Sequence, residues 1–306
     1  MVAAALVVAL IGGSALPALA QDLEEWLERA AQAEYSGRQF TLCDTPDGRM
    51  VEIVEVAQRD GVLEVRASFG SAVVSSAGVY QRDSEGTMSV TSAEALSKWS
   101  LSDRYEVVFG EPDRVLNRSV DILRIMQGDL VRMRLAFDRE SGAVIQAEVL
   151  NADETRYCIS SFLLFEPSSE EITHPAMVAE VIEPIVNSDR RLPDNLAGFI
   201  RKDAYEGPSG SITGFYSDGL FSFTLVAADR RIAVHGMDDA VPATINGALY
   251  HRTFSPGQSF HSWETPSGGY VMLGDLPLDL QDAVLSELPK PGKPGILTRF
   301  WRKFFG

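Results

Sequence analysis

Residues 129–166 carry the clearest hydrophobic pattern of the chain, an alternation with a period of two. This pattern predicts three strands, and the connectors between them are short and rich in turn formers. Short connectors favour an antiparallel meander. In the middle strand, one set of alternate positions is apolar and the other includes Gln146 and Glu148, which predicts one covered face and one largely solvated face. The predicted strands are Asp129–Asp138, Ala143–Leu150 and Thr155–Phe165.

A short amphipathic helix and further strands are predicted before this meander. Asp22 can cap a helix whose apolar positions, including Trp26, recur at helical spacing, and Gly37 is expected to end it. A hairpin signal containing glycine follows. A capping box predicts another short helix near residue 92. The predicted elements are the helix from Asp22, strands at Met50–Ala57 and Val62–Phe69, and a helix over 92–101.

A second, smaller region is predicted after a polar, proline-containing stretch at 171–190. Asp218-Gly219 is a hairpin signal between two apolar segments, and Pro277 suits the first turn of a helix. About 100 residues are enough for a sheet with one helix over it. The predicted elements are strands at Ser211–Ser217, Leu220–Ala227 and Gly269–Leu273 and a helix over 278–288.

Length and charge narrow the class of protein. The chain has 306 residues, 45% of them hydrophobic, which suits about two globular domains. Its net charge is −16, so it repels the phosphate backbone of a nucleic acid, and we expect no nucleic-acid partner.

Residues 1–20 are uncharged and end in Ala18-Leu-Ala20, which is typical of a secretory signal peptide before its cleavage site. Because such a run can also just span a bilayer, a retained anchor is the alternative. Both interpretations place the rest of the chain outside the cytoplasm, and we expect a periplasmic location.

The chain contains two cysteines, Cys43 and Cys158, and both follow the predicted cleavage site. In an oxidising compartment such a pair is a candidate disulfide. It would link the beginning and the end of the first predicted sheet. Two buried free thiols are the alternative.

No motif in the sequence predicts catalysis or a cofactor. The four histidines stand in no metal-binding spacing, and neither a nucleophile elbow nor a phosphate-binding or dinucleotide-binding loop occurs. We therefore expect a protein that is not an enzyme and binds no metal or cofactor. A hydrolase is retained as the contrasting hypothesis.

The last 17 residues, 290–306, contain five basic residues and no acidic one. Two Pro-Gly steps are followed by a segment with apolar residues on one helical face and basic residues on the other. Such a segment is typical of a helix at the surface of an anionic membrane, and docking on a partner or on the acidic body of the chain is the alternative. The predicted contact residues are Arg299, Phe300, Trp301, Arg302, Lys303, Phe304 and Phe305.

Six segments of the chain form an ordered set of motifs: Leu130–Gly142, Glu148–Asn151, Ser161–Phe165, Leu192-Pro193, Phe215–Phe223 and Met272–Pro277. In their order and spacing these segments resemble the sigma-E factor regulatory protein (RseB/MucB) family. The resemblance covers most of residues 22–288, although the first 80 residues of the mature chain match only loosely.

The resemblance implies an α+β fold with two domains. The first domain would be a curved antiparallel half-barrel over helices, similar to the lipoprotein carriers LolA and LolB, and the second a smaller antiparallel sheet with a helix. The implied organisation is a signal peptide at 1–20, the LolA-like domain at 21–170, a linker at 171–190, a regulatory domain at 191–289 and the basic tail at 290–306.

The resemblance also implies a function in envelope-stress signalling. The partner would be the exported part of a membrane-spanning anti-sigma factor, whose proteolysis the protein would modulate. A periplasmic carrier or sensor of lipid or lipoprotein is the alternative, and self-association into a homo-oligomer stays open. The cysteine pair and the basic tail are not part of the general family pattern.

Overall fold

The computed structural model divides the chain into two compact units, residues 1–181 and 182–306. The border lies within the polar stretch 171–190. The structure describes Trp26, residues 28–67, 103–168, 191–207, 210–229, 240–255 and 258–292, and the backbone of residues 70–75, 78–83 and 88–92.

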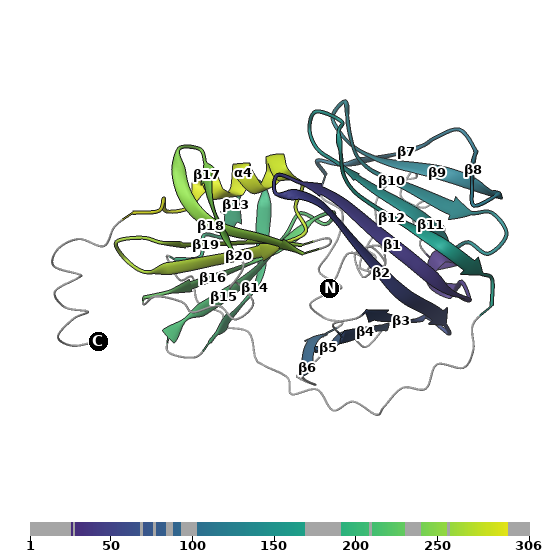
Figure 1. Cartoon of the computed structure of the whole chain (residues 1–306), viewed down its shortest axis with the longest axis horizontal. Coiled ribbons are helices and arrows are strands. Elements are labelled where there is room, and N and C mark those ends of the chain that lie inside the picture. Colours follow the sequence, from purple (N-terminus) through teal and green to yellow (C-terminus); the bar gives the residue numbers. More distant parts are fainter. Residues whose placement is uncertain are drawn as a thin grey trace. The chain divides into compact units, whose positions relative to one another are not determined.

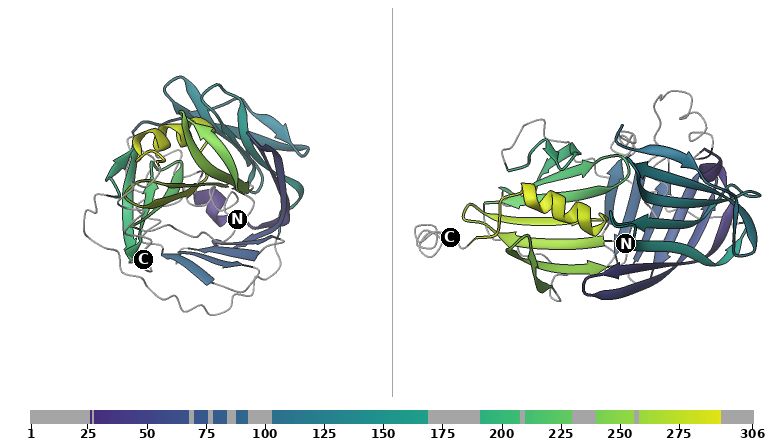
Figure 2. Two further views of the ribbon diagram at one scale, coloured as in Figure 1. Left: turned by 60° about the vertical axis from the view of Figure 1, so that its left-hand side comes forward. Right: turned by 90° about the horizontal axis from the view of Figure 1, so that it is seen from above.

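The first unit is built on one 12-stranded antiparallel sheet, which curves around the short helical segment near its N-terminus (Figure 1, Figure 2). The strand order is β6-β5-β4-β3-β2-β1-β12-β11-β10-β9-β7, and β8 pairs with β9. The strands are β1 (Tyr35–Thr45), β2 (Gly48–Arg59), β3 (Val62–Ala67), β4 (Gly70–Ser75), β5 (Gly78–Asp83), β6 (Met88–Ser92), β7 (Glu106–Phe109), β8 (Asp113–Val115), β9 (Arg118–Gln127), β10 (Leu130–Asp138), β11 (Val144–Leu150) and β12 (Arg156–Glu166).

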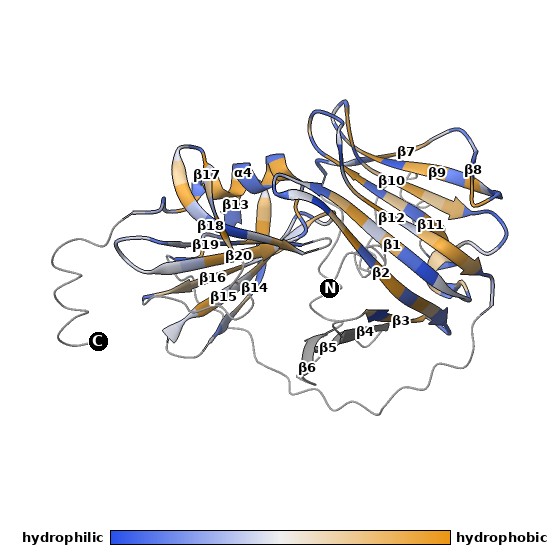
Figure 3. Cartoon of the chain, viewed as in Figure 1, coloured by the Kyte–Doolittle hydropathy of each residue, from blue (hydrophilic) through white to orange (hydrophobic). Residues whose placement is uncertain are grey.

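The predicted meander is confirmed as β10, β11 and β12, which pair antiparallel with bounds within one residue of those expected. The hairpin of β2 and β3 is confirmed as well. Hydrophobic and hydrophilic positions alternate along these strands (Figure 3). Ile145 and Ala147 of β11 are buried, whereas Gln146 and Glu148 are partly exposed, so the alternation does assign the two faces of the strand.

The first helix ends earlier than predicted. Trp26 and residues 28–32 are helical, and strand β1 already begins at Tyr35. Gly37 is therefore a strand residue and not a helix terminator. A Cβ atom at Gly37 would lie 2.0 Å from the carbonyl oxygen of Leu164, so glycine is needed where β12 approaches β1.

The hydrophobic core of the first unit brings together residues from distant strands. Side chains of β1, β2 and β3 pack with those of β9 to β12 on the same face of the sheet. Burial of this apolar surface is the main stabilising term for the curved sheet. The cluster consists of Ala33, Tyr35, Val54, Val56, Leu63, Val65, Val120, Ala136, Ala143, Ile145 and Phe162.

Among its described residues, the second unit contains an 8-stranded antiparallel sheet and one helix, and the strand order is β13-β14-β15-β16-β20-β19-β18-β17. The predicted hairpin around Asp218-Gly219, the strand before Gly274 and the last helix are confirmed. The elements are β13 (Asn195–Leu196), β14 (Phe199–Glu206), β15 (Ile212–Ser217), β16 (Ser222–Ala228), β17 (Val241–Ile245), β18 (Ala248–Ser255), β19 (Gln258–Glu264), β20 (Gly269–Gly274) and α4 (Leu278–Glu287).

Several predicted segments lie outside the described residues. These are the signal peptide at 1–20, the linker at 171–190, the tail from residue 293 onward, and the helix predicted over 92–101 except Ser92, which belongs to β6. The contact residues predicted in the tail, Arg299 to Phe305, are therefore not placed.

Candidate functional site

The helical segment at residues 26–32 lies on the concave side of the first sheet (Figure 2). The Trp26 ring packs against Phe137 of β10, with ring centroids 5.3 Å apart, and against Phe109 of β7 at 6.2 Å. The guanidinium carbon of Arg29 stands 4.9 Å above the Trp26 ring centroid, and an Arg29 amino group donates a hydrogen bond of 3.4 Å to the carbonyl oxygen of Arg139. These contacts join the segment to the β7–β10 side of the sheet.

Gln58 of β2 holds the other end of this helical segment. Its Nε2 donates to the carbonyl oxygens of Ala30 and Ala31, at 2.5 and 3.0 Å, which satisfies carbonyls at the helix C-terminus. The Tyr35 hydroxyl donates to Oε1 of Gln58 at 3.0 Å. Burial raises the pKa of Tyr35, so this hydroxyl stays protonated and remains a donor. The segment is thus fixed to β2 at one end and to β10 at the other.

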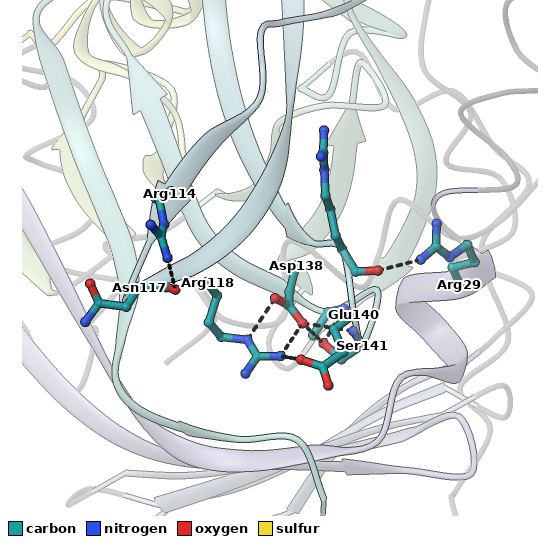
Figure 4. A network of polar contacts seen from close by, with 9 residues as sticks. Arg29, Arg114, Asn117, Arg118, Asp138, Glu140 and Ser141 are labelled. Atoms are coloured by element: carbon teal, nitrogen blue, oxygen red, sulfur yellow. Dashed lines mark hydrogen bonds and ion pairs between the residues drawn. The ribbon is translucent and has the colours of Figure 1, made fainter.

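A polar network closes the turn between β10 and β11 (Figure 4). Arg118 donates from Nε and one amino group to the two carboxylate oxygens of Asp138, at 2.8 and 2.9 Å, and to Glu140 at 2.7 Å. The backbone N–H and the hydroxyl of Ser141 donate to the same Asp138 carboxylate, at 2.8 and 2.6 Å. Arg118 also covers the ring of Phe165 at 5.2 Å.

The network determines the charge state of Asp138. Burial of the carboxyl acts to raise its pKa, but the hydrogen bonds from Arg118 and Ser141 and the charge of Arg118 outweigh burial, so the pKa is lowered. Asp138 is therefore ionised at neutral pH and neutralised by Arg118. The arrangement is that of a structural turn, because the carboxylate is fully used by its donors.

The predicted disulfide between Cys43 and Cys158 is present. The two cysteines face each other across β1 and β12, with Cα atoms 4.1 Å apart. The expectation that it would link the two ends of the sheet is wrong, because β1 and β12 are neighbours in the middle of the strand order. We call the β1–β12 pair the seam, because it joins the β1–β6 half of the sheet to the β7–β12 half. The disulfide links the two strands of this seam.

The seam also carries buried polar groups beside the disulfide. The hydroxyls of Thr41 and Ser160 lie 2.7 Å apart in a hydrogen bond, and both side chains are buried. Because the bond satisfies both hydroxyls, their burial does not oppose the pairing of the two strands. The seam is thus closed by covalent, polar and backbone interactions together.

The opposite face of the same strands is apolar and exposed. Leu42 of β1 stands between Val51 of β2 and Ile159 of β12, and the next row pairs Phe40 with Ile53. Val51 is 57% exposed and Ile53 43%, and both Leu163 and Leu164 of β12 are 52% exposed. Contiguous exposed side chains of this kind mark surfaces for protein contact more often than isolated ones do. The outer apolar face consists of Phe40, Leu42, Val51, Ile53, Ile159, Leu163 and Leu164.

In the second unit, the predicted motif residues serve the core and its turns. Tyr216 and Phe223 stack with ring centroids 4.8 Å apart, and Phe221 is buried as well, so all three are core residues. The Tyr216 hydroxyl donates to the carbonyl oxygen of Pro193 at 2.8 Å. This bond connects Leu192-Pro193 to the later hairpin.

Among the described residues, no group of three or more His, Cys, Asp or Glu side chains could hold a metal ion. No helix in that part of the chain is long and apolar enough to cross a membrane.

The comparisons with known proteins give a structural likeness. No protein-family model matches the chain, and no curated protein sequence is similar to it. A chain in the complex of Pseudomonas aeruginosa MucA and MucB is similar with a TM-score of 0.52 and 16% identity, over 90% of this chain and 100% of that one. This protein therefore shares the fold of that chain.

Two further structures are less similar. A crystal structure of MucB gives a TM-score of 0.49 at 17% identity, over 87% of this chain and 97% of that one. A LolA superfamily protein from Nitrosomonas europaea gives 0.22 at 8% identity, over 84% of this chain and 96% of that one.

Proposed function

We propose that this protein is an exported regulatory binding protein, whose partner is the exported part of a membrane-spanning anti-sigma factor. One observation carries the proposal: the fold shared with a chain of the MucA–MucB complex extends over 90% of this chain and all of the other. The ordered sequence motifs point to the same family. By binding the exported segment, the protein would modulate its proteolysis in envelope-stress signalling.

The surface chemistry of the first unit supports a protein partner. The outer apolar face offers exposed aliphatic side chains in the middle of a sheet, and Arg38 and Glu55 stand opposite each other at its edge. An apolar centre with a charged rim is the usual anatomy of a protein–protein contact. Residues 1–181 contain 29 acidic and 15 basic residues, a net charge of −14, which favours a segment with basic residues close to a membrane.

Capture in intact cells tests this proposal. A photo-crosslinking residue replaces Ile53 in the outer apolar face of the full chain, and captured proteins are identified by mass spectrometry. We expect the crosslinker at position 53 to capture one single-span membrane protein, in an amount proportional to the amount of crosslinker. A matched chain with the crosslinker at Asp60, in the exposed turn between β2 and β3, controls for random collision.

Co-purification distinguishes binding at another face from failure of the proposal. If neither position captures a single-span membrane protein, the untagged partner should still co-purify in stoichiometric amount with the affinity-tagged full chain. Absence of such a protein in both experiments would overturn the proposed function.

A lipid or lipoprotein carrier or sensor is the second candidate function. The apolar residues on the concave side of the curved sheet support it, and Phe109, which packs against Trp26 on that side, is 41% exposed. The proposal includes a LolA-like half-barrel with a cavity that takes an acyl chain. Native mass spectrometry of gently purified protein tests it: bound lipid in place of a captured membrane protein would favour the carrier.

The remaining organisation is part of the same proposal. Residues 1–20 direct export to the periplasm, 21–170 and 191–289 form the two domains, and the basic tail at 290–306 binds the membrane surface or the partner. The protein acts by binding and catalyses no reaction. If an active-site probe labelled the protein and the labelling depended on a single residue, the proposed absence of catalysis would be contradicted.

A further inference from the structure

Two buried acidic side chains of the second unit bind neighbouring backbone amides of the β15–β16 turn, that of Phe221 and that of Ser222. Asp218 belongs to this turn, and Asp275 lies in the connection between β20 and α4. Asp218 and Asp275 are 2% and 9% exposed. They come from motifs about 55 residues apart in the sequence, and neither has a role in the proposed partner binding.

Asp218 organises the turn itself. Its Oδ1 accepts hydrogen bonds from the backbone N–H groups of Leu220 and Phe221, at 3.0 and 2.9 Å. The hydroxyl of Ser217 donates to the carbonyl oxygen of Phe221 at 3.1 Å and accepts from the N–H of Gly219 at 3.0 Å. The turn is therefore held from inside by two side chains, and Ser222, where β16 begins, is bound by Asp275.

Asp275 connects this turn to the start of the helix. Its Oδ1 accepts from the backbone N–H of Ser222 at 3.0 Å, and its own N–H donates to the carbonyl oxygen of Ser222 at 3.4 Å. Next to it, a Cβ atom at Gly274 would lie 2.6 Å from the Cβ of Phe223, so β16 and β20 approach closely here. Asp218, Ser222, Gly274 and Asp275 form what we call the Asp218–Asp275 clasp.

The charges around the clasp are few and mostly negative. Burial, and then the charge of Asp218, raise the pKa of Asp275 to about 7, although its hydrogen bond from Ser222 acts in the opposite direction. Strand β16 has no titratable side chain and β20 has only Tyr270. Strand β15 contributes Tyr216, β19 contributes His261 and Glu264, and α4 contributes Asp279, Asp282 and Glu287.

We propose that the Asp218–Asp275 clasp is a pH-responsive lock, closed while the Asp275 carboxyl is protonated and loosened when it is ionised. A charge on Asp275 is unfavourable there because the site is buried and a second carboxyl, that of Asp218, binds the neighbouring amide. In the opened state Asp275 reaches water and ionises freely. Opening releases the β15–β16 turn from the residues that precede α4.

The direction of the pH effect follows from linkage. The pKa of Asp275 is higher in the closed state than in an open or unfolded chain, so the closed state binds more protons. The stability that the clasp contributes is complete at low pH and is lost as the pH rises through about 7. Raising the pH from 6 to 8 should therefore shift the closed–open equilibrium about tenfold toward the open state.

Amide hydrogen exchange of the full chain tests the lock. After correction for the intrinsic pH dependence of exchange, the protection of the Ser222 and Phe221 amides should fall about tenfold between pH 6 and pH 8. The amides of Ile145 and Leu135 in the first unit serve as internal controls and should keep their protection. Protection of Ser222 that does not change with pH would overturn the proposal.

Two variants separate the lock from a general effect of pH. Asp275→Asn keeps an acceptor for Ser222 but cannot ionise, so the exchange protection of the Ser222 amide in this variant should be independent of pH. Asp218→Asn keeps the acceptor of the turn and removes its charge, so the fall in Ser222 protection should occur at lower pH. If Asp275→Asn does not fold, the ¹³C titration of the Asp275 carboxyl in the wild-type chain decides: a midpoint near the ordinary value for aspartate would contradict the lock.

Discussion

Asp138 ends β10, and its neighbours could be only partly expected from the sequence. The turn-forming residues after it predict the turn, and Ser141 is near enough in the chain to be an expected donor. Arg118 is not, because it precedes Asp138 by 20 residues and reaches it only through the pairing of β9 with β10. Local chemistry thus determines the turn, and strand register determines its neutralising partner.

Replacement of Asp138 by Asn should lower the free energy of unfolding by about 2 to 3 kcal/mol, because it removes the buried charge that pairs with Arg118 and leaves only the exposed carboxylate of Glu140. Chemical denaturation at pH 7 measures this loss. Because the pKa of Asp138 is lowered, the contribution of its charge is present above the ordinary pKa of aspartate and lost as the pH falls below it. The difference between the variant and the wild type should therefore shrink in acid.

Asp121→Asn is the matched control for that variant. The ion pair of Asp121 with Arg139 is more exposed, so its loss should lower the free energy of unfolding clearly less than the loss of Asp138 does. Equal destabilisation by the two variants would show that the Asp138 network has no special role.

At the scale of elements, the pairing of β1 with β12 decides the architecture of the first unit. All other neighbours among β1 to β6 follow one another along the chain, and β9 to β12 do the same, so each half can form from local hairpins. Only the seam brings together strands that are more than 100 residues apart. The disulfide and the helical segment between Gln58 and Arg139 both connect these two halves.

Removal of the disulfide should therefore destabilise the first unit strongly. The double variant Cys43→Ala, Cys158→Ala should lose roughly 4 to 5 kcal/mol of unfolding free energy, because the bond closes a loop of about 115 residues in the unfolded chain. Equilibrium denaturation with and without reductant measures the effect. In reductant, the unfolding midpoint of the wild-type chain should approach that of the variant. A wild-type midpoint that complete reduction leaves unchanged would show that the disulfide does not contribute to stability.

At the scale of the whole molecule, charge is distributed unevenly along the sequence. The tail at 290–306 has five basic residues and no acidic one, so the remaining chain has 22 basic and 43 acidic residues, a net charge of −21. An acidic body is repelled by an anionic membrane, whereas a basic segment with aromatic residues is attracted to it. Membrane association, if it depends on this protein alone, should therefore depend on the tail.

Deletion of residues 290–306 tests this dependence. The full chain should float with anionic liposomes at low salt and be released as salt is raised, because each basic residue contributes about 1 kcal/mol through a screened interaction. The shortened chain should stay at the bottom of the gradient. A matched variant, Phe300→Ala with Trp301→Ala, keeps all five charges and should bind more weakly, and equal flotation of all three forms would refute the membrane role of the tail.

The sequence by itself determined the local elements of this protein. Alternation with a period of two fixed the strands and faces of the β10–β12 meander, and glycine and aspartate at the turns fixed both predicted hairpins. These signals are local, since side chains on one face of a strand are two residues apart and a turn involves four residues. The cysteine pair was also evident, because only two cysteines exist.

Only the tertiary structure decided which distant residues meet. Three features depend on contacts between segments 27 to 119 residues apart. They are the central position of β1 and β12 in the sheet, the cap that Gln58 provides for the helical segment, and the Asp218–Asp275 clasp. No periodic pattern encodes such contacts, because they arise when the sheet curves and its apolar face is buried. Where Gly37 was expected to end a helix, the close approach of a strand from the other end of the unit made it a strand residue instead.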